Sequence, residues 1–118
     1  MSEKAVLVID DDKRTRETLR LLLELEGYVV DFYESGPCAF ERLQNMRFEF
    51  ILIDYRLPQS DGTEVTRSVR GLYPDAFIIG MGMENKKSEF MGAGANAFIN
   101  KARLVQYLML IVTRKLRQ

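Results

Sequence analysis

Phe-Glu-Phe-Ile-Leu-Ile-Asp-Tyr-Arg-Leu-Pro-Gln-Ser-Asp-Gly, residues 48–62, is the most informative segment of this chain. Its apolar run, residues 50–53, is rich in aromatic and β-branched side chains and predicts a strand buried on both faces, as in a parallel sheet. The run ends at Asp54, and burying a carboxylate is costly unless another group pairs with it. Ligands of open parallel sheets bind at the carboxyl ends of the strands. Asp54 is therefore either a turn cap or a candidate functional residue, and residues 55–62 predict a loop.

The composition excludes several classes of protein. At 118 residues we expect one domain, residues 1–118, whose core needs no disulfide. Apolar residues make up 47% and charged residues 29%, which is typical of a globular chain rather than a disordered one. Lys+Arg and Asp+Glu are both 17, so no net charge attracts the chain to nucleic acid or to a membrane surface.

The cysteine and histidine content points to a reducing compartment and disfavours zinc. Cys38 is the only cysteine and cannot form an internal disulfide, and the absence of histidine argues against a classical zinc site. No secretory signal opens the sequence, and no apolar run is long enough to cross a bilayer. We therefore expect a cytoplasmic protein.

Strand-like and helix-like segments alternate along the whole chain. Strands are expected at residues 5–9, 28–33, 50–54, 76–79 and 97–99. Helices are expected between them, including a short one at residues 85–91, and after the last strand. Five strands alternating with five helices predict an α/β fold, an open parallel sheet with helices on both faces.

The helices carry apolar side chains at helical spacing, which indicates packing against the sheet. Asp12 is expected to cap the first helix and Gly27 to end it, while Ser35 and Pro37 open the second. The expected inner faces are formed by Leu19, Leu22 and Leu23, by Ala39, Phe40 and Leu43, by Val65, Val69 and Leu72, and by Leu104, Leu108, Ile111 and Val112.

Acidic residues follow two of the predicted strands. Asp10, Asp11 and Asp12 end the first strand, and they meet Asp54 if the first and third strands are neighbours. Clustered carboxylates repel each other, and either raised pKa values or a divalent cation such as Mg²⁺ relieves the repulsion. The alternative is that these acids only cap a helix, which explains Asp12 well and Asp10 poorly.

One basic residue is placed to complete such a site. Lys101 directly follows the fifth predicted strand, in Phe-Ile-Asn-Lys. Taken alone it is an ordinary solvated lysine at a helix start. Together with acids after the first and third strands, it predicts a site for a phosphoryl group on Asp54, with the carboxylate as nucleophile and a metal and an ammonium neutralising the phosphoryl oxygens.

Over nearly its whole length the chain resembles the receiver domain of two-component response regulators. The matching segments are Val-Leu-Val-Ile-Asp-Asp-Asp at 6–12, Phe-Ile-Leu-Ile-Asp-Tyr-Arg-Leu-Pro-Gln-Ser-Asp-Gly at 50–62 and Gly-Ala-Asn-Ala-Phe-Ile-Asn-Lys at 94–101. The resemblance implies a flavodoxin-like (CheY-like) five-stranded parallel sheet in the order 2-1-3-4-5. It also implies that Asp54 accepts a phosphoryl group from a sensor histidine kinase or a histidine phosphotransfer protein.

The resemblance further implies roles for individual residues. Asp10 and Asp11 would hold Mg²⁺ together with Asp54 and the backbone carbonyl of Arg56, and Lys101 would bind the phosphate. Such a domain is not an enzyme in the ordinary sense, because it catalyses at most its own phosphorylation and dephosphorylation.

The expected partners follow from the same resemblance. They are the phosphodonor protein and a downstream effector or an output domain outside these residues, with no direct binding of nucleic acid and no membrane. A homodimer would use the face of the fourth helix, fifth strand and fifth helix. Arg114, Lys115 and Arg117 are expected to complement the dipole of the last helix rather than to bind nucleic acid.

The switch region departs from the family pattern. Gly82 stands where the family has Thr or Ser at the end of the fourth strand, and Phe98 occupies the position of the switch aromatic. Ala102 replaces the usual proline after Lys101, so a trans bond is expected there. The segment between Gly82 and Lys101 is a few residues shorter than the family norm, which predicts a clipped fourth helix.

Two alternatives remain open. The first is a pseudo-receiver that acts as a phosphorylation-independent protein-interaction module, which Gly82 and Ala102 favour. The second is a haloacid dehalogenase-like phosphatase, because Asp10-Asp11-Asp12 satisfies an Asp-x-Asp start. That second alternative leaves the aspartate at the end of the third strand, Asp54, without a role.

Overall fold

The computed structural model describes residues 4–117, with side chains described for residues 4–113. A five-stranded parallel sheet runs through the centre in the order β2-β1-β3-β4-β5, as predicted. Its strands are β1 (Ala5–Ile9), β2 (Val29–Tyr33), β3 (Phe50–Asp54), β4 (Ile78–Gly82) and β5 (Ala97–Asn100).

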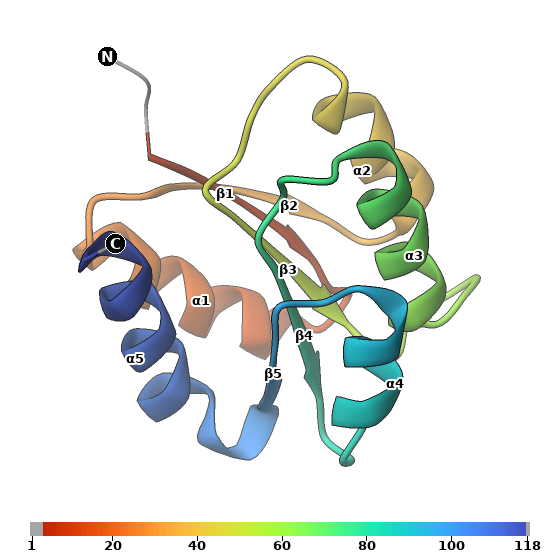
Figure 1. Cartoon of the computed structure of the whole chain (residues 1–118). Coiled ribbons are helices and arrows are strands. Elements are labelled where there is room, and N and C mark those ends of the chain that lie inside the picture. Colours follow the sequence, from red (N-terminus) through yellow and green to blue (C-terminus); the bar gives the residue numbers. More distant parts are fainter. Residues whose placement is uncertain (1–3, 118) are drawn as a thin grey trace.

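Helices cover both faces of the sheet. They are α1 (Lys13–Leu25), α2 (Gly36–Leu43), α3 (Gly62–Leu72), α4 (Lys87–Ala93) and α5 (Leu104–Arg117), with a 3-10 turn, η1 (Lys101–Arg103), before α5. Figure 1 shows α1 and α5 on one face and α2, α3 and α4 on the other. No helix within residues 4–117 combines the length and the hydrophobicity that crossing a bilayer requires.

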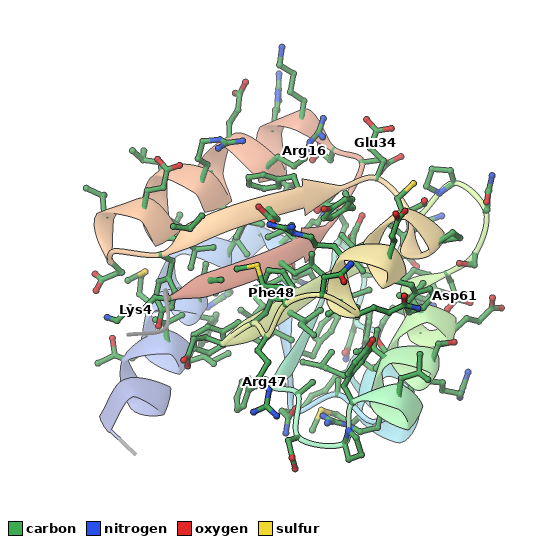
Figure 2. The ribbon with its side chains drawn as sticks, turned by 90° about the horizontal axis from the view of Figure 1, so that it is seen from above. Lys4, Arg16, Glu34, Arg47, Phe48 and Asp61 are labelled. Carbon is green, nitrogen blue, oxygen red and sulfur yellow. The ribbon has the colours of Figure 1, made fainter. Side chains whose placement is uncertain are left out.

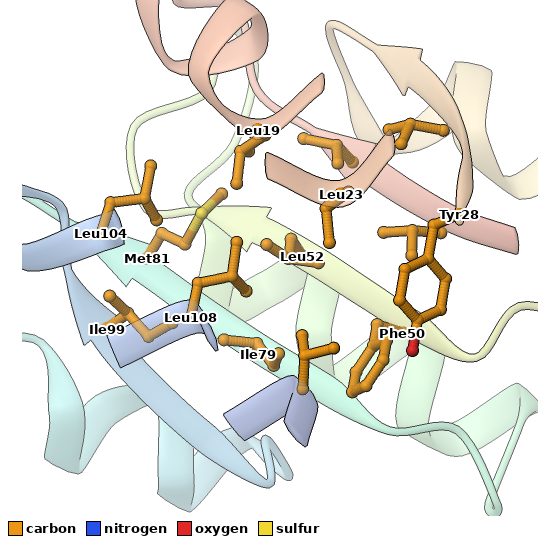
Figure 3. Close-up of a cluster of buried hydrophobic side chains, with 14 residues drawn as sticks. Leu19, Leu23, Tyr28, Phe50, Leu52, Ile79, Met81, Ile99, Leu104 and Leu108 are labelled. Atoms are coloured by element: carbon orange, nitrogen blue, oxygen red, sulfur yellow. The ribbon is translucent and has the colours of Figure 1, made fainter. Parts of the chain in front are cut away.

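The core on the α1 and α5 face is built from alternate strand residues. Leu52, Ile79, Met81 and Ile99 point from the sheet toward Leu19 and Leu23 of α1 and toward Leu104 and Leu108 of α5 (Figure 3). The next residues along the same strands, such as Ile51, Ile53 and Ile78, pack on the other face with Val65 and Val69 of α3. Both faces are therefore buried, which explains why the strands read as continuous apolar runs rather than alternating ones.

The termini of α1 and α3 agree with their sequence signals. Asp12 caps α1 and accepts hydrogen bonds from the Arg14 N–H at 3.3 Å and the Thr15 hydroxyl at 2.7 Å. Gly27, which follows the end of α1, has a φ of +87°, a conformation that other residues rarely adopt. Asp61 caps α3 by accepting from the Thr63 N–H at 2.8 Å.

Several boundaries and one face differ from the sequence predictions. β2 begins at Val29 rather than Tyr28, and β5 ends at Asn100 rather than Ile99. β4 begins at Ile78 rather than Ala76 and continues to Gly82. The glycines at 80 and 82 have low strand propensity, so the sequence pattern does not predict this extension, which pairing with β3 and β5 stabilises. α4 spans Lys87–Ala93 rather than residues 85–91, and its seven residues agree with the predicted short helix.

Leu72 was predicted to face the core, and this is wrong. It is the last residue of α3, and its side chain is 63% exposed. The helix ends there, and Tyr73 is no longer helical, so nothing covers Leu72. The expected role of Arg114, Lys115 and Arg117 concerns side chains that lie outside the described ones.

The register aligns the carboxyl ends of the central strands. Ile9 of β1 pairs with Ile53 of β3, so Asp10 and Asp54 leave the sheet side by side. Lys4, which precedes β1, and Asp61, which precedes α3, lie at opposite ends of the sheet in Figure 2. The acids gather at the Asp61 end.

Candidate functional site

Three carboxylates converge at the carboxyl ends of β1 and β3. Asp10, Asp11 and Asp54 each offer an oxygen, and these three atoms lie within 4.8 Å of one another. Asp10 is fully buried, Asp54 is 5% exposed, and Asp11 faces solvent. The structure thus brings together the acids that the strand order predicts, whereas Asp12 turns away to cap α1.

Lys101 lies between the two buried carboxylates. Its Nζ atom is 2.9 Å from Asp10 Oδ2 and 3.0 Å from Asp54 Oδ1, and the lysine side chain is only 9% exposed. The Asn100 side chain positions the turn that carries Lys101 by accepting from the Ala102 N–H at 2.9 Å. No cis peptide bond occurs within residues 4–117, so the bond between Lys101 and Ala102 is trans, as predicted. Sequence reasoning had placed Lys101 in the site without foreseeing this double ion pair.

Burial sets the protonation of the site. It raises the pKa of Asp54 from 3.8 to about 6, the negative charge of Asp10 adds to this rise, and Lys101 opposes it. Burial likewise raises the pKa of Asp10. The Asp12 N–H, which donates to Asp10 Oδ1 at 2.8 Å, partly offsets this rise. Burial alone would lower the pKa of Lys101, but the carboxylates of Asp10 and Asp54 raise it above its usual value. The lysine is therefore protonated at neutral pH, and the positive charge is held inside the cluster.

The donor atoms suit a small hard cation. Asp10 Oδ2 is buried and pairs with the Lys101 ammonium at 2.9 Å. Carboxylate oxygens in a group of three are ligands that Mg²⁺ accepts while keeping several waters. The residues present therefore fit a divalent cation at Asp10, Asp11 and Asp54. Arg56 lies on the adjoining loop, where its backbone forms an isolated antiparallel β-bridge with that of Asp61.

A cavity of about 220 Å³ opens beside Asp54. Residues from the ends of all the central strands line it, namely Asp11, Asp12, Asp54, Tyr55, Arg56, Gly82, Met83, Glu84 and Lys101. A larger cavity of about 620 Å³, lined by residues that include Arg47 and Phe48, contains none of the clustered acids and does not include Lys101. The smaller cavity is the one that the titratable groups surround, and we take it as the functional one.

The rim of this cavity carries contacts that sequence reasoning missed. The Arg56 guanidinium donates to the Glu84 carboxylate and so joins the loops after β3 and β4. The Lys86 ammonium lies 4.8 Å from the centre of the Tyr55 ring, which it faces as a cation–π partner. These pairs are about thirty residues apart in sequence, and no local pattern signals them.

The predicted switch positions lie beside the site. Gly82 ends β4, pairs with Asn100 and borders the cavity. A Cβ atom at this position would lie 3.3 Å from the Glu84 carbonyl oxygen and 3.6 Å from the Phe98 ring. Phe98 is half-buried and packs on Phe90, with the ring centres 5.6 Å apart.

The family model of the response regulator receiver domain matches residues 6–113 of this chain. The chain belongs to this family. The predicted family and the flavodoxin-like fold are both confirmed, and the haloacid dehalogenase-like alternative has no support.

Curated relatives of this receiver domain are longer regulators. It is 32% identical over 119 residues to the transcriptional regulatory protein ResD of Bacillus subtilis, covering 99% of this chain and 50% of ResD. It is 31% identical over 116 residues to the response regulator MprA of Mycobacterium tuberculosis, covering 96% of this chain and 50% of MprA. The receiver domain therefore spans about half the length of the curated relatives that it matches.

Solved structures similar to the receiver domain share its complete fold. The response regulator protein TrrA of Thermotoga maritima, in complex with Mg²⁺-BeF, superposes with a TM-score of 0.86 at 27% identity, covering 95% of this chain and 98% of TrrA. A CheY-like receiver domain protein of Methanospirillum hungatei superposes with a TM-score of 0.88 at 28% identity, covering 98% of this chain and 95% of that protein's chain.

Proposed function

We propose that this receiver domain accepts a phosphoryl group on Asp54 in a magnesium-dependent reaction. The donor is a sensor histidine kinase or a histidine phosphotransfer protein. The observation that carries the proposal is the position of Asp54, a buried carboxylate at a strand end that lies between two further acids and a buried ammonium. No helix cap or structural ion pair requires three acids in one place.

Each residue has a distinct task in this proposal. A carboxylate oxygen of Asp54 forms the new O–P bond while the N–P bond of the donor phosphohistidine breaks. Since the pKa of Asp54 is about 6, the carboxylate is largely ionised at neutral pH and able to attack. Lys101 contacts Asp54 at 3.0 Å and is the cation placed to meet a phosphoryl oxygen there.

Mg²⁺ would be held by Asp10, Asp11, Asp54 and the backbone carbonyl of Arg56, and when bound it would offset the charge of the phosphoryl oxygens. The solved TrrA structure, described as a complex with Mg²⁺-BeF, supports this assignment by analogy. Water returns Asp54 to its free form by attacking the phosphorus, so the domain catalyses no turnover beyond its own modification.

The wider role is proposed from the relatives. We place residues 1–118 in one receiver domain of a cytoplasmic regulator, acting on a downstream effector or an output domain, without direct binding of nucleic acid. The exposed Tyr107 of α5, which lines a hollow together with Lys87 of α4 and Phe98 of β5, favours the face of α4, β5 and α5 as the contact for a partner or a second copy.

A pseudo-receiver is the second candidate function. Gly82 offers no hydroxyl to the cavity, and Lys101 is already engaged by Asp10 and Asp54. Under this alternative the ion pairs lock the site, and the domain binds its partner without phosphorylation.

Intact-mass measurement after incubation with acetyl phosphate and Mg²⁺ separates the two. We expect the wild type to gain one phosphoryl group, transiently and only with the metal. Asp54→Asn should gain none, and Asp75→Asn, at an exposed acid remote from the cluster, should behave like the wild type. A wild type that stays unmodified would support the pseudo-receiver, and multiple turnover of phosphate esters would contradict both.

A further inference from the structure

The side chain of Phe90, on α4, packs against the face of the sheet next to the functional site. Phe90 is fully buried although α4 has only seven residues. Its ring packs edge-on against Tyr55, with centres 6.3 Å apart, and at a tilt against Phe98, with centres 5.6 Å apart. Phe90 is therefore in contact with the residue that follows Asp54 and with the predicted switch aromatic.

A glycine in β4 makes room for this ring. Gly80 pairs with Ile53 on one side and with Phe98 on the other. It therefore lies between two large residues in one row across the sheet and has no side chain of its own there. A Cβ atom at Gly80 would lie 2.4 Å from both Cγ and Cδ1 of Phe90, closer than atoms can approach. The ring thus lies directly on the β4 backbone, two residues before Gly82.

The tip of the same ring lies against the backbone that supports Asp54. A Cβ atom at Gly62 would lie 2.1 Å from the Asp54 carbonyl oxygen and 3.0 Å from Phe90 Cζ. The Gly62 N–H also donates to the Tyr55 carbonyl at 2.7 Å, and the Tyr55 N–H donates to the Met81 carbonyl at 2.8 Å. Phe90 consequently contacts the closed loop through which the chain leaves Asp54 and enters α3.

We propose that Phe90 is a positioning residue that couples Asp54 to α4 by packing. This inference rests on the proposed function of Asp54. Because the ring packs directly on the backbone of Gly80 and its tip lies against Gly62, a shift of the loop at Gly62 or of β4 at Gly80 must displace Phe90 and the helix that carries it. Coupling of this kind acts in both directions, so a partner that moves α4 also changes the geometry at Asp54.

The test compares Phe90→Leu with Phe50→Leu. Phe50 is also fully buried, but it packs with Tyr28 and Phe77 in the core on the opposite face. Both variants remove similar apolar volume, so a purely structural effect is the same in both. Phe90→Met, which keeps a large flexible side chain, provides the conservative rescue.

The first readout needs no ligand. Hydrogen exchange at the Gly62 amide should be about tenfold faster in Phe90→Leu than in Phe50→Leu, and Phe90→Met should restore much of the protection. Equal exchange at Gly62 in the two leucine variants would overturn the proposal, whatever the chemistry of Asp54.

The second readout uses Mg²⁺ with beryllofluoride as the probe. In the wild type and Phe50→Leu, the amide signals of Tyr55, beside the site, and of Glu89 and Met91, on α4, should all shift. In Phe90→Leu the Tyr55 signal should still shift, while the α4 shifts fall to less than about half. Undiminished α4 shifts in Phe90→Leu would refute the coupling. A wild-type Tyr55 signal that does not respond would instead refute the proposed function, and the exchange measurement would then decide the coupling.

Gly80→Ala supplies an independent check on the packing. Alone it should destabilise the protein, since the added Cβ meets the Phe90 ring. Combined with Phe90→Leu, the loss should be smaller than the sum of the two single losses. Strict additivity would contradict the contact on which the inference depends.

Discussion

The ammonium of Lys101 lies 3.0 Å from Asp54 Oδ1 and 2.9 Å from Asp10 Oδ2, so one buried cation pairs with two buried carboxylates. Sequence reasoning offered raised pKa values or a metal as the means of relieving repulsion among these acids. The metal-free fold uses the lysine, and the pKa values of both aspartates still remain above their ordinary value. The site is therefore held together by an ion pair and is at the same time electrostatically strained.

Removing the lysine should expose this strain. Lys101→Met leaves two buried carboxylates without a partner, and we expect a loss of about 3 kcal/mol in the free energy of unfolding at pH 8 without metal. Mg²⁺ should restore part of the loss. Chemical denaturation measures it, with Lys87→Met, at an exposed lysine of α4, as the control. A variant as stable as the wild type would show that the ion pairs contribute nothing.

Neutralising Asp54 should have the opposite effect. The pKa of Asp54 is raised to about 6, so the folded state holds its proton more tightly than the unfolded state does. The stability due to this proton is fully present below pH 4 and is lost as the pH rises through 6, by up to about 3 kcal/mol. Asp54→Asn should therefore raise the melting temperature at pH 8 in the presence of a chelator.

The gain from Asp54→Asn should shrink as the pH falls and vanish near pH 4. Asp10→Asn should likewise raise the melting temperature at pH 8, because burial also raises the pKa of Asp10. Melting temperatures measured from pH 4 to pH 8 test both variants, with Asp75→Asn as the exposed control. A lower melting temperature for Asp54→Asn at pH 8 would mean that its pairing with Lys101 outweighs desolvation.

Magnesium should bind where the three acids meet. Titration to roughly millimolar Mg²⁺ should shift the backbone signals of Asp10, Asp11 and Asp54, because three clustered carboxylates gain a counterion there. Asp11→Asn and Asp54→Asn should weaken the binding, and Asp75→Asn should not. If both site variants bind as well as the wild type, the metal ligands are misassigned.

A hydroxyl at position 82 should strengthen signalling. We predict that Asp54 can be phosphorylated in the wild type, yet that the face of α4, β5 and α5 responds less than in an ordinary receiver, because Gly82 has no hydroxyl to bond the phosphoryl group. A Thr side chain would fit tightly, since its Cβ atom would lie 3.6 Å from Phe98 and 3.3 Å from the Glu84 carbonyl oxygen, which would have to shift by a few tenths of an ångström.

Gly82→Thr should accordingly enlarge the response of that face to beryllofluoride with Mg²⁺, measured by chemical shifts. Gly82→Ala, which adds the Cβ atom without the hydroxyl, is the matched control and should leave the response near that of the wild type. A full-sized rearrangement in the wild type that Gly82→Thr does not change would count against the idea.

Much of the fold follows from local pattern. The continuous apolar runs ending at Ile9 and Ile53 indicate buried parallel strands, because only strands covered on both faces can be apolar at every position. Caps such as Asp12 and stops such as Gly27 act within a few residues of themselves, and the structure has them where the sequence predicts them. The convergence of Asp10, Asp11 and Asp54 follows from strand order alone, since the carboxyl ends of parallel strands share one edge.

By itself, then, the sequence determined the strands, the helices and the acids that follow the first and third strands, because these depend on periodicity and on neighbours close in the chain. The strand order, which brings those acids together, was implied by the resemblance to receiver domains rather than by local pattern. The tertiary structure alone decided the contacts that span the strands. The glycines at 80 and 82 look like breaks in β4, and only pairing on both sides makes them strand. Phe90 looks like any core residue until the register sets Ile53, Gly80 and Phe98 in one row beneath it. Likewise, Lys101 meets two carboxylates at once because three strands end level in space, and side-chain distances across a sheet are set by register and packing rather than by sequence spacing.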